Sequence, residues 1–510
     1  MARHETLAAI DLGSNSFHLL VGRVVDGQIY PLDSLREVVR LGGGLTADKR
    51  IDRATQARAL EALGKFHELL RGFPRQAVRA VGTNALRVAK NAAPFLREAR
   101  AALGFPIEVI AGREEARLIY LGVAHTTPPA PQRPPYRRLV VDIGGGSTEF
   151  IVGQGIEPLL TESLYMGCVS YSLKYFPGGE VSKGAMKAAE LAARQELSGI
   201  VRAYRTAGWD EAVASSGTAR SLENILRENG FAEEGLTREG LEKLRSLLIK
   251  NERADPDDIA GLRQNRAAVL PGGLAILGAA LDEFGIDSMR VSEGALRHGV
   301  LYDLLGRVEH RDMREVTVAQ FMRRYRVDAA QAERVRALAL IIYDALSPGA
   351  DRDDDADRVL LDWAARLAEI GLSIAHSQYH KHSAYVLSYG DMPGFSRMEQ
   401  ARLARIVLAH RGKLSKVQDA GLEGGDWKLV FALRTASLIL RSRTDARLPF
   451  LRVAADAGGF AIDLPQSWLD ENALSAAALE AETDYWKAVG MKLAVSGLSD
   501  KKVSVLKQIR

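Results

Sequence analysis

Two stretches of the chain share one pattern of apolar, acidic and small residues. Residues 8–22 read AAIDLGSNSFHLLVG, and residues 140–153 read VVDIGGGSTEFIVG. Each has an apolar run, an aspartate, a turn of small residues and a second apolar run, which is the pattern of a β-hairpin. The two align without a gap, so that Asp11 falls on Asp142. The chain therefore contains an internal repeat.

Strand and helix patterns alternate through the first 308 residues. An apolar run, a turn with glycine and a helical pattern follow one another in residues 77–96, 105–127, 213–226 and 289–305. Such alternation is typical of an α/β fold. The proline-rich residues 126–138 are expected to form an exposed connection. The sequence thus predicts two α/β lobes, residues 1–126 and 127–308, with their hairpins facing each other across a cleft.

The pattern changes near residue 309. Amphipathic helices with few strand signals are predicted for residues 318–346, 359–376 and 399–414. The acidic residues 348–358 are expected to form a solvated loop. Strand patterns return in residues 448–465 and helices follow. We therefore expect a helical domain over residues 309–445 and a small α+β domain over residues 446–510.

Composition restricts the class of protein. The chain has 510 residues, 47% of them hydrophobic and 26% charged, which is ordinary for a globular protein of roughly three or four domains. It has no apolar run long enough for a transmembrane helix and no signal-peptide pattern. The single cysteine, Cys168, fits a reducing cytoplasm and is expected to be a small buried residue rather than a nucleophile. A net charge of +4 permits a polyanionic ligand without requiring one.

The glycine-rich turns are candidates for binding phosphate. Neither turn is a Walker loop or a dinucleotide fingerprint, because no Lys-Ser/Thr pair follows and each turn leads into a strand. The backbone N–H groups of Gly144, Gly145 and Gly146 can approach an anion closely. Asp11 and Asp142, just before the turns, would then need a cation beside them, which indicates a magnesium-dependent phosphoryl site. Either turn alone would equally fit an ordinary hairpin, but the duplicated pair favours the phosphate site.

Seven segments together resemble one family. They read AAIDLGSNSFHLLVGRVVDG, VGTNALRVAKN, GREEARLIYLGVAHT, VDIGGGSTEF, MGCVSYSLKYFPGG, SSGTARSL and VSEGALRHGVLYDLLGR. Their combination resembles the bacterial exopolyphosphatase and guanosine pentaphosphate phosphohydrolase family over essentially the whole chain. The resemblance implies two duplicated ribonuclease H-like lobes of the actin-like ATPase superfamily, an α-helical HD-like domain and a small α+β domain. It also implies a cytoplasmic homodimer.

The resemblance implies a role for particular residues. Glu115 would position and activate the attacking water, and Asp142 and Glu149 would bind magnesium, with Glu149 also acting on the water. The implied phosphate contacts are Asp11, Ser14, Asn15, Ser16, Arg87, Gly144, Gly145, Gly146, Ser147, Gly217, Thr218 and Arg266. Hydrolysis of a phosphoanhydride requires an in-line water and neutralisation of phosphoryl charge, which arginine provides well. The neighbouring Glu114 is expected to be a solvated acid in the first turn of a helix.

The helical domain departs from the HD pattern. The metal-binding His-Asp pair is replaced by Ala368-Glu369, so we expect no second metal-dependent active site there. Histidines and basic residues remain close in sequence: His376, His380, His382, His410, Lys381, Arg411, Lys413 and Lys416. They would line a channel for a long polyanion or simply form solvated helix faces, and both interpretations stay open.

The resemblance favours an exopolyphosphatase that releases orthophosphate from the ends of inorganic polyphosphate. The segments DIGGGSTE, YFPGG and VSEGALR favour this branch, whereas GVAHTT favours the alternative, a guanosine pentaphosphate phosphohydrolase. A kinase of the same superfamily is less compatible with a water-activating glutamate, and a non-catalytic binding or assembly protein would not need the three acids. The expected cofactor is Mg²⁺, with a monovalent cation such as K⁺ as an option. Neither a nucleic-acid nor a membrane partner is expected.

Overall fold

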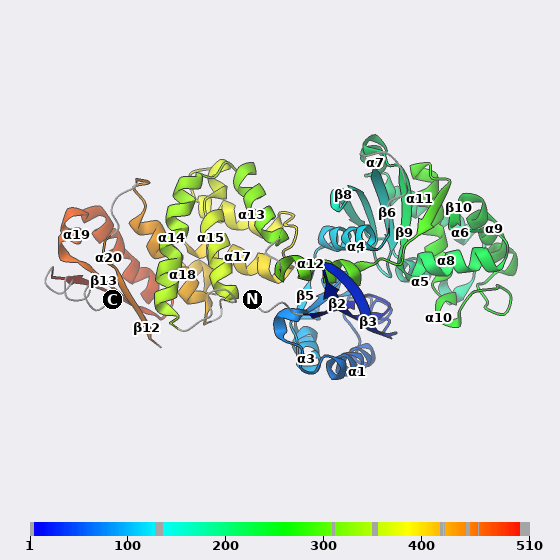
Figure 1. The fold of residues 1–510 in the computed structure, drawn as a ribbon, viewed down its shortest axis with the longest axis horizontal. Helices are drawn as coiled ribbons and strands as arrows, with labels where there is room; N and C mark the ends of the chain where they lie inside the picture. Colours follow the sequence, from blue (N-terminus) through cyan, green and yellow to red (C-terminus); the bar gives the residue numbers. More distant parts are fainter. Residues whose placement is uncertain are drawn as a thin grey trace. The chain divides into compact units, whose positions relative to one another are not determined.

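The computed structural model describes residues 5–127, 136–308, 312–348, 355–418, 422, 424–444, 449–456 and 458–499. The chain forms two compact units, Ala2–Met313 with Pro393–Arg397, and Arg314–Met392 with Met398–Arg510 (Figure 1). Most of the proline-rich connection expected at residues 126–138 lies outside the described residues. The same holds for most of the expected acidic loop.

The first unit contains two sheets with the same strand order. One runs β3-β2-β1-β4-β5 and the other β8-β7-β6-β9-β11, with β10 added at its edge. The first sheet comprises β1 (Thr6–Leu12), β2 (Phe17–Val25), β3 (Gln28–Glu37), β4 (Val78–Gly82) and β5 (Ile107–Val109). The second comprises β6 (Arg137–Ile143), β7 (Thr148–Gln154), β8 (Glu157–Leu164), β9 (Glu211–Ser215), β10 (Leu236–Thr237) and β11 (Ser288–Val291). The predicted pair of duplicated α/β lobes is confirmed.

The duplication extends to the register of the hairpins. Asp11 pairs with His18 across β1 and β2, and Asp142 pairs with Glu149 across β6 and β7. The next strand pair in each sheet shifts register before the same glycine, Gly22 or Gly153. A side chain at either glycine would clash within the protein, because its Cβ would lie within 2.5 Å of the side chain of Ile29 or of Tyr120. Residues that align in the sequence repeat therefore also hold equivalent positions in the two hairpins.

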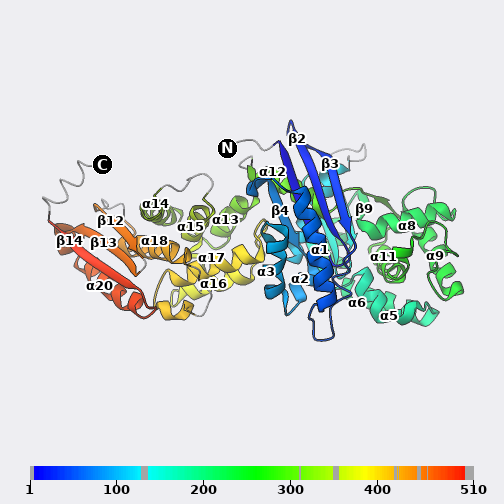
Figure 2. The ribbon, with the colours of Figure 1, turned by 90° about the horizontal axis from the view of Figure 1, so that it is seen from below.

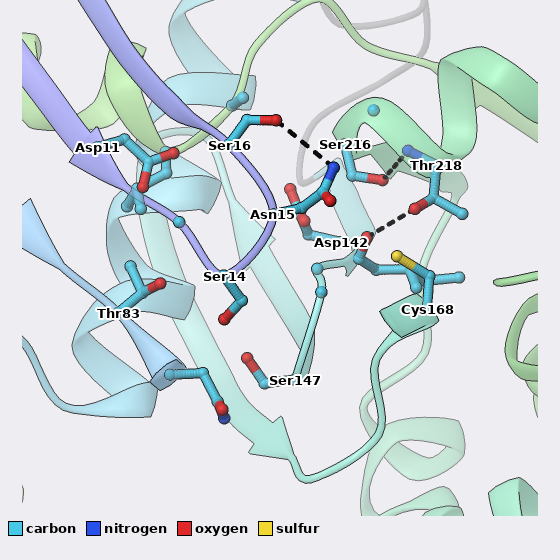
Figure 3. A pocket seen from close by; sticks show the side chains of 18 of the residues that line it. Asp11, Ser14, Asn15, Ser16, Thr83, Asp142, Ser147, Cys168, Ser216 and Thr218 are labelled. Carbon is cyan, nitrogen blue, oxygen red and sulfur yellow. Dashed lines mark hydrogen bonds between the residues drawn. The ribbon is translucent and has the colours of Figure 1, made fainter. Parts of the chain in front are cut away.

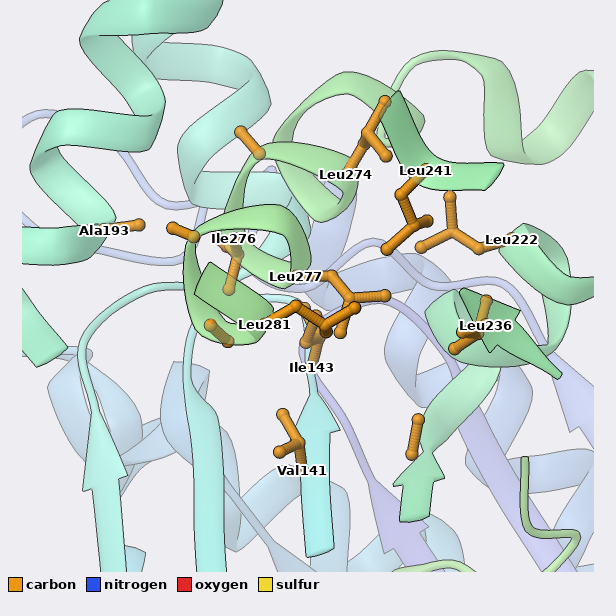
Figure 4. Close-up of a cluster of buried hydrophobic side chains, with 14 of the residues drawn as sticks. Val141, Ile143, Ala193, Leu222, Leu236, Leu241, Leu274, Ile276, Leu277 and Leu281 are labelled. Carbon is orange, nitrogen blue, oxygen red and sulfur yellow. The ribbon is translucent and has the colours of Figure 1, made fainter. Parts of the chain in front are cut away.

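Helices cover the outer face of each sheet. In the first lobe these are α1 (Arg53–Leu69), α2 (Asn84–Val88) and α3 (Ala92–Leu103), of which α1 and α3 bury apolar residues against the strands (Figure 2). In the second lobe they are α5 (Cys168–Tyr175), α6 (Lys183–Leu197), α7 (Val201–Ala207), α8 (Ser216–Glu228), α9 (Arg238–Asn251), α10 (Gln264–Ala267) and α11 (Leu270–Phe284). Helix α11 is buried on nearly all sides, and its leucines fill the core above β6 (Figure 4).

Two helices lie between the sheets and join the lobes. They are α4 (Gly112–Thr126) and α12 (Leu296–Val308). Although α4 belongs to the first lobe by sequence, it packs on β7 and β8, while α12 returns from the second lobe to pack on β1, β2 and β4. The two helices also pack closely on each other, since a side chain at Gly299 would overlap the backbone of Leu118. One apolar core therefore spans both sheets.

A buried network of ion pairs holds α4 and α12 to the first sheet. Asp303 of α12 pairs with Arg79 of β4 at 2.6 Å and with Arg117 of α4. Burial alone would raise the pKa of Asp303, but the charges of these arginines outweigh it and hold the pKa well below its usual range. The carboxylate is therefore ionised and shared by two elements.

The second unit joins helices to a small sheet. Its helices are α13 (Met313–Arg324), α14 (Ala329–Leu346), α15 (Ala356–Leu367), α16 (Tyr379–Tyr389), α17 (Arg397–Ala409), α18 (Asp426–Ile439), α19 (Gln466–Glu471) and α20 (Ala473–Lys487). The strands β12 (Arg452–Asp456) and β13 (Gly459–Pro465) form a hairpin within residues 448–465, where strands were expected, and β14 (Lys492–Leu498) adds in parallel to β13. Phe431 of α18 stacks on Phe460 of β13 with their ring centroids 4.4 Å apart, and this contact anchors the sheet to the helices. Among the described residues no helix is both long and apolar enough to cross a membrane.

Replacing Asp303 by asparagine should strongly destabilise the first unit. Asparagine keeps the shape of the side chain but leaves Arg79 and Arg117 without their shared counter-charge. Loss of one partner of a buried ion pair typically lowers the free energy of unfolding by about 3–5 kcal/mol. Calorimetric unfolding of the full chain would measure the shift.

The matched control for this experiment is Asp282→Asn. Asp282 also bridges two arginines, Arg194 at 2.8 Å and Arg238 at 3.3 Å, but its side chain is 43% exposed. Such a surface pair contributes about 1 kcal/mol or less. Equal shifts for the two variants would show that the buried network does not stabilise the unit.

Candidate active site

The turns of the two hairpins meet at the centre of the first unit. A Cβ at Gly145 would lie 3.0 Å from Cβ of Ser14, and a Cβ at Gly146 would lie 2.7 Å from Oδ1 of Asn84. The approach is possible because these glycines lack side chains. Figure 3 shows Ser14 and Ser147, one from each turn, with their hydroxyl groups directed toward the same space. The predicted face-to-face placement of the turns is present in the structure.

A cavity between the lobes brings together most of the residues expected at the site. Its lining includes Asp11, Ser14, Asn15, Ser16, Glu115, Asp142, Gly144, Gly145, Gly146, Ser147, Gly217, Thr218 and Arg266. Arg87 and Glu149, which were also expected, are not among the described lining residues. The roles of all these residues stay predictions, but their convergence from distant parts of the chain matches the expected phosphate site.

A third turn, between β9 and α8, completes the cavity. Ser216 has a φ of 98°, a left-handed conformation that is strained for a residue with a side chain. Its Oγ accepts hydrogen bonds from the N–H groups of Thr218 at 3.1 Å and Ala219 at 3.2 Å, which compensates for the strain. A side chain at Gly217 would overlap the guanidinium of Arg266. Gly217 thus lets this guanidinium reach the cavity wall.

Carboxylates crowd the base of the cavity. Burial, followed by the charge of Glu115, raises the pKa of Asp11 to about 8, and burial is also the main cause that raises the pKa of Asp142 to about 6. Burial and the charges of Glu115 and Asp142 raise the pKa of Glu149 well above its usual range. Moreover, Oδ1 of Asp11 is buried and has no hydrogen-bond partner. Such a group of acids is suited to a bound cation, which would relieve the repulsion.

Arg87 and Glu149 lie outside the described lining of the cavity, and their contacts show how they are held. Arg87 pairs with Glu115 at 2.5 Å and donates a hydrogen bond to the carbonyl of Ile110 at 3.2 Å. Glu149 accepts a hydrogen bond from Oγ of Ser163 at 2.7 Å. Arg87 therefore holds the carboxylate of Glu115, and its expected contact to phosphate stays a prediction.

Two arginines of the cavity were missed by the sequence analysis. Arg220 lies in the first turns of α8 and Arg297 in the first turn of α12, and both line the cavity. The charge of Arg297 lowers the pKa of Asp11, although burial of the acid outweighs it. A signal for both exists in the sequence: GALR ends in the same three letters as GTNALR, which carries Arg87, and GTAR shares its first two letters and its final arginine. Each is a glycine turn followed by a helix with an early arginine.

Glu114 is buried, so the expectation that it is solvated is wrong. Its carboxylate accepts two hydrogen bonds of 2.8 Å from Arg117 and one of 2.9 Å from the N–H of Gly394. Arg117 in turn pairs with Asp303 of α12. Packing against distant segments, which the local pattern cannot reveal, thus makes Glu114 part of the structural network.

The expected basic surface of the second unit is also smaller than the sequence suggested. His380 and His410 are buried, and Lys416 is half-buried, whereas Lys381, Arg411 and Lys413 are exposed. Two of the four histidines are therefore mostly buried, although His410 still lines a cavity with His376 and Arg411. At the replaced HD pair, Ala368 is buried and Glu369 pairs with Arg443 at 2.6 Å.

Comparisons with known proteins agree with the family that the sequence motifs suggested. The model of the Ppx/GppA phosphatase family matches residues 20–308, and that of Ppx/GppA phosphatase domain III matches residues 313–483. The protein is thus a hydrolase of phosphoanhydride bonds. It belongs to the Ppx/GppA phosphatase family.

Similar proteins correct the prediction of an exopolyphosphatase. A protein of Aeromonas hydrophila subsp. hydrophila named guanosine-5'-triphosphate,3'-diphosphate pyrophosphatase is 37% identical over 487 residues, covering 95% of this chain and 97% of its own. A protein of the same name from Vibrio campbellii is 36% identical over 490 residues, covering 96% and 97%. These names favour the alternative that the sequence analysis had placed second.

Solved structures cover the first unit. A Ppx/GppA family member of Aquifex aeolicus is 27% identical with a TM-score of 0.51, and the match covers 60% of this chain and 99% of that one. An exopolyphosphatase of Cytophaga hutchinsonii is also 27% identical, with a TM-score of 0.53 and coverage of 59% and 97%. A protein named exopolyphosphatase therefore shares the fold of much of this chain, so the fold alone does not select the substrate.

The raised pKa of Asp11 predicts a pH-dependent stability. In the unfolded chain an aspartate titrates near about 4, whereas burial raises the pKa of Asp11 to about 8 in the folded protein. The folded state therefore binds the proton more tightly, and stability should fall as the pH rises from about 4 to about 8. Because asparagine cannot ionise, Asp11→Asn should melt at a higher temperature than the wild type at pH 8.5 and at a similar temperature at pH 4.

Thermal unfolding without divalent cations or phosphate would measure this difference. The control is Asp33→Asn in β3, whose side chain is exposed and should leave the pH dependence unchanged. A melting temperature of Asp11→Asn that follows the wild type across the whole pH range would show that Asp11 is not strained when ionised.

Proposed function

We propose that the protein hydrolyses guanosine-5'-triphosphate,3'-diphosphate, releasing orthophosphate from the end of the 5'-triphosphate. The observation that carries this proposal is the 36–37% identity, over 95–96% of the chain, to relatives named for that substrate. The cavity between the lobes supports it, since its glycine turns and arginines suit a terminal phosphoryl group. Homodimerisation, a cytoplasmic location and a need for K⁺ stay predictions.

The two hairpin turns would hold the terminal phosphoryl group from opposite sides. Backbone N–H groups at glycine-rich turns bind phosphate oxygens without side-chain bulk. The hydroxyls of Ser14 and Ser147 add donors from each lobe. Arg266, Arg220 and Arg297 lie in the same lining and would neutralise the charge that develops on the phosphoryl oxygens.

The acids of the cavity fit a magnesium ion that is shared with the substrate. Among the described residues no cluster of three or more His, Cys, Asp and Glu side chains is placed to hold a metal. Mg²⁺ is usually bound by one or two carboxylates together with substrate phosphates and water. Asp142 and Asp11, with its unpartnered Oδ1, fit this requirement. Bound magnesium would neutralise phosphate charge.

Glu115 is placed to hold the attacking water. It lies at the first turn of α4, lines the cavity and is fixed by Arg87 at 2.5 Å. The ion pair with Arg87 holds the carboxylate in place, and a carboxylate so placed can accept a proton from a water molecule. The protein would thereby supply the two requirements of phosphoanhydride hydrolysis, a positioned water and a neutralised phosphoryl group.

Glu115→Gln should lower kcat by about 10²–10⁴-fold, because an amide can hold a water but cannot accept its proton. KM should stay within a few-fold of the wild type, since the glycine turns and the cavity arginines are unchanged. The control is Glu98→Gln on the exposed side of α3, which should retain full activity. A fully active Glu115→Gln enzyme would move the water-activating role to another acid, with Glu149 the first candidate.

Phosphate release from three substrates tests the function itself. The kcat/KM for guanosine-5'-triphosphate,3'-diphosphate should exceed those for GTP and for long-chain polyphosphate, and chelation of magnesium should abolish all three. A higher kcat/KM for polyphosphate than for the nucleotide would overturn the proposal. Activity that persists in a chelator would overturn the role given to Asp11 and Asp142.

A further inference from the structure

A second cavity adjoins the one that holds the hairpin turns. The two cavities share Gly217, Arg220 and Arg266 as a common wall. The second cavity is also lined by Arg36, Arg227, Arg263, Asn224 and Asn265. An extended ligand with one end in the first cavity can therefore reach the second without leaving the protein surface.

Five arginines reach the second cavity from three segments. Arg220, Asn224 and Arg227 are four and then three residues apart on α8, so they share one face of the helix. Arg263 and Arg266 come from the start of α10. Arg36 comes from β3 of the other lobe and donates a hydrogen bond to Oγ of Ser16 at 3.3 Å, which ties the cavity to the first hairpin turn.

Arginines outnumber acids around this cavity. Among the residues that the structure describes, the acids in its lining are Glu223 and Glu293, and the side chain of Glu293 is 86% exposed and 3.9 Å from Arg220. Glu228, outside the lining, lies 3.5 Å from Arg227. Burial raises the pKa of Glu223, which favours its neutral form. Burial, followed by the charges of neighbouring arginines, lowers the pKa of Arg36 and of Arg266. Repulsion among the arginines would be relieved by a ligand group with several negative charges.

We propose that the second cavity binds the 3'-diphosphate of the substrate while the 5'-triphosphate occupies the first. The inference rests on the proposed function and explains how the enzyme would select this nucleotide. A nucleotide with phosphates at two positions of its ribose carries two anionic arms, and two adjoining cationic cavities match that pattern. Arginine suits the second arm because its fork pairs with two phosphate oxygens. GTP, which has no 3' phosphates, would leave the second cavity without its ligand.

The test uses a double variant, Arg227→Gln with Arg263→Gln, because these residues line the second cavity and not the first. The kcat/KM for guanosine-5'-triphosphate,3'-diphosphate should fall about 10–100-fold, the loss expected for charge-assisted hydrogen bonds. The kcat/KM for GTP and for tripolyphosphate should change less than about three-fold. Arg202→Gln, which removes an exposed charge from α7 outside both cavities, is the matched control.

The outcomes separate this inference from the function on which it rests. A wild type that does not hydrolyse the pentaphosphate nucleotide overturns the proposed function and the inference together. Equal losses on the nucleotide, GTP and tripolyphosphate by the double variant overturn the inference alone, because the arginines would then serve the 5' chain. A loss confined to long-chain polyphosphate also overturns it, since the cavity would then follow a linear chain.

Weaker binding of the reaction product provides a second measurement. Release of the terminal phosphate leaves guanosine with a diphosphate at both positions, so this product should inhibit the wild type. The double variant should be inhibited about 10–100-fold more weakly by the product, whereas inhibition by GDP should be unchanged. Identical inhibition of wild type and variant by the product would contradict a 3'-diphosphate site.

Discussion

Repulsion between like charges is the constraint that shapes the centre of this protein. Burial, followed by the charges of Glu115 and Asp142, raises the pKa of Asp11 and of Glu149 within one region, and Arg220, Arg266 and Arg297 line the same cavity as Asp11 and Asp142. Both the acids and the arginines are destabilised without a ligand, because buried acids resist ionisation and clustered guanidinium groups repel one another. A phosphorylated ligand with a cation would satisfy both, since its oxygens face the arginines and the cation faces the acids. The unliganded protein is therefore organised around charges that only a ligand can balance, at some expense of stability.

The two lobes keep the same backbone but divide the chemistry. Both hairpins place an aspartate before a turn of small residues, so each lobe contributes one carboxylate and one set of N–H groups. The residue that pairs with each aspartate differs between the lobes: Asp11 pairs with His18, and Asp142 pairs with Glu149. Burial and nearby arginines lower the pKa of His18 to about 3, which keeps it neutral. The duplication thus supplies two equivalent turns of small residues, and single differences in sequence between the lobes make the two sides unequal.

Local patterns were sufficient to predict the lobes, because the strand period and the ungapped repeat are properties of neighbouring residues. Local patterns were insufficient where segments far apart in the sequence determine the surroundings of a residue. Glu114 looked solvated because α12, which buries it with Arg117, comes more than a hundred residues later in the chain. Arg220 and Arg297 looked like ordinary helix residues until the fold brought them to the cavity. The strand β14 has only a partly buried face and little alternation, so it was missed. The exopolyphosphatase branch was favoured on a few short segments, whereas similarity over nearly the whole chain favours the other branch.

The return of α12 to the first sheet has a consequence for synthesis of the protein. Strands β1, β2 and β4 leave the ribosome early, yet the helix that covers their inner face begins only at Leu296. Until then Leu7, Ala9 and Leu20, which are buried in the finished core, have no partner from that helix. The outer face of the first sheet has a core formed within its own lobe, but the inner face is completed only by contacts of very long sequence separation, which form slowly. The inner face of the first sheet therefore stays without α12 until most of the first unit has been synthesised.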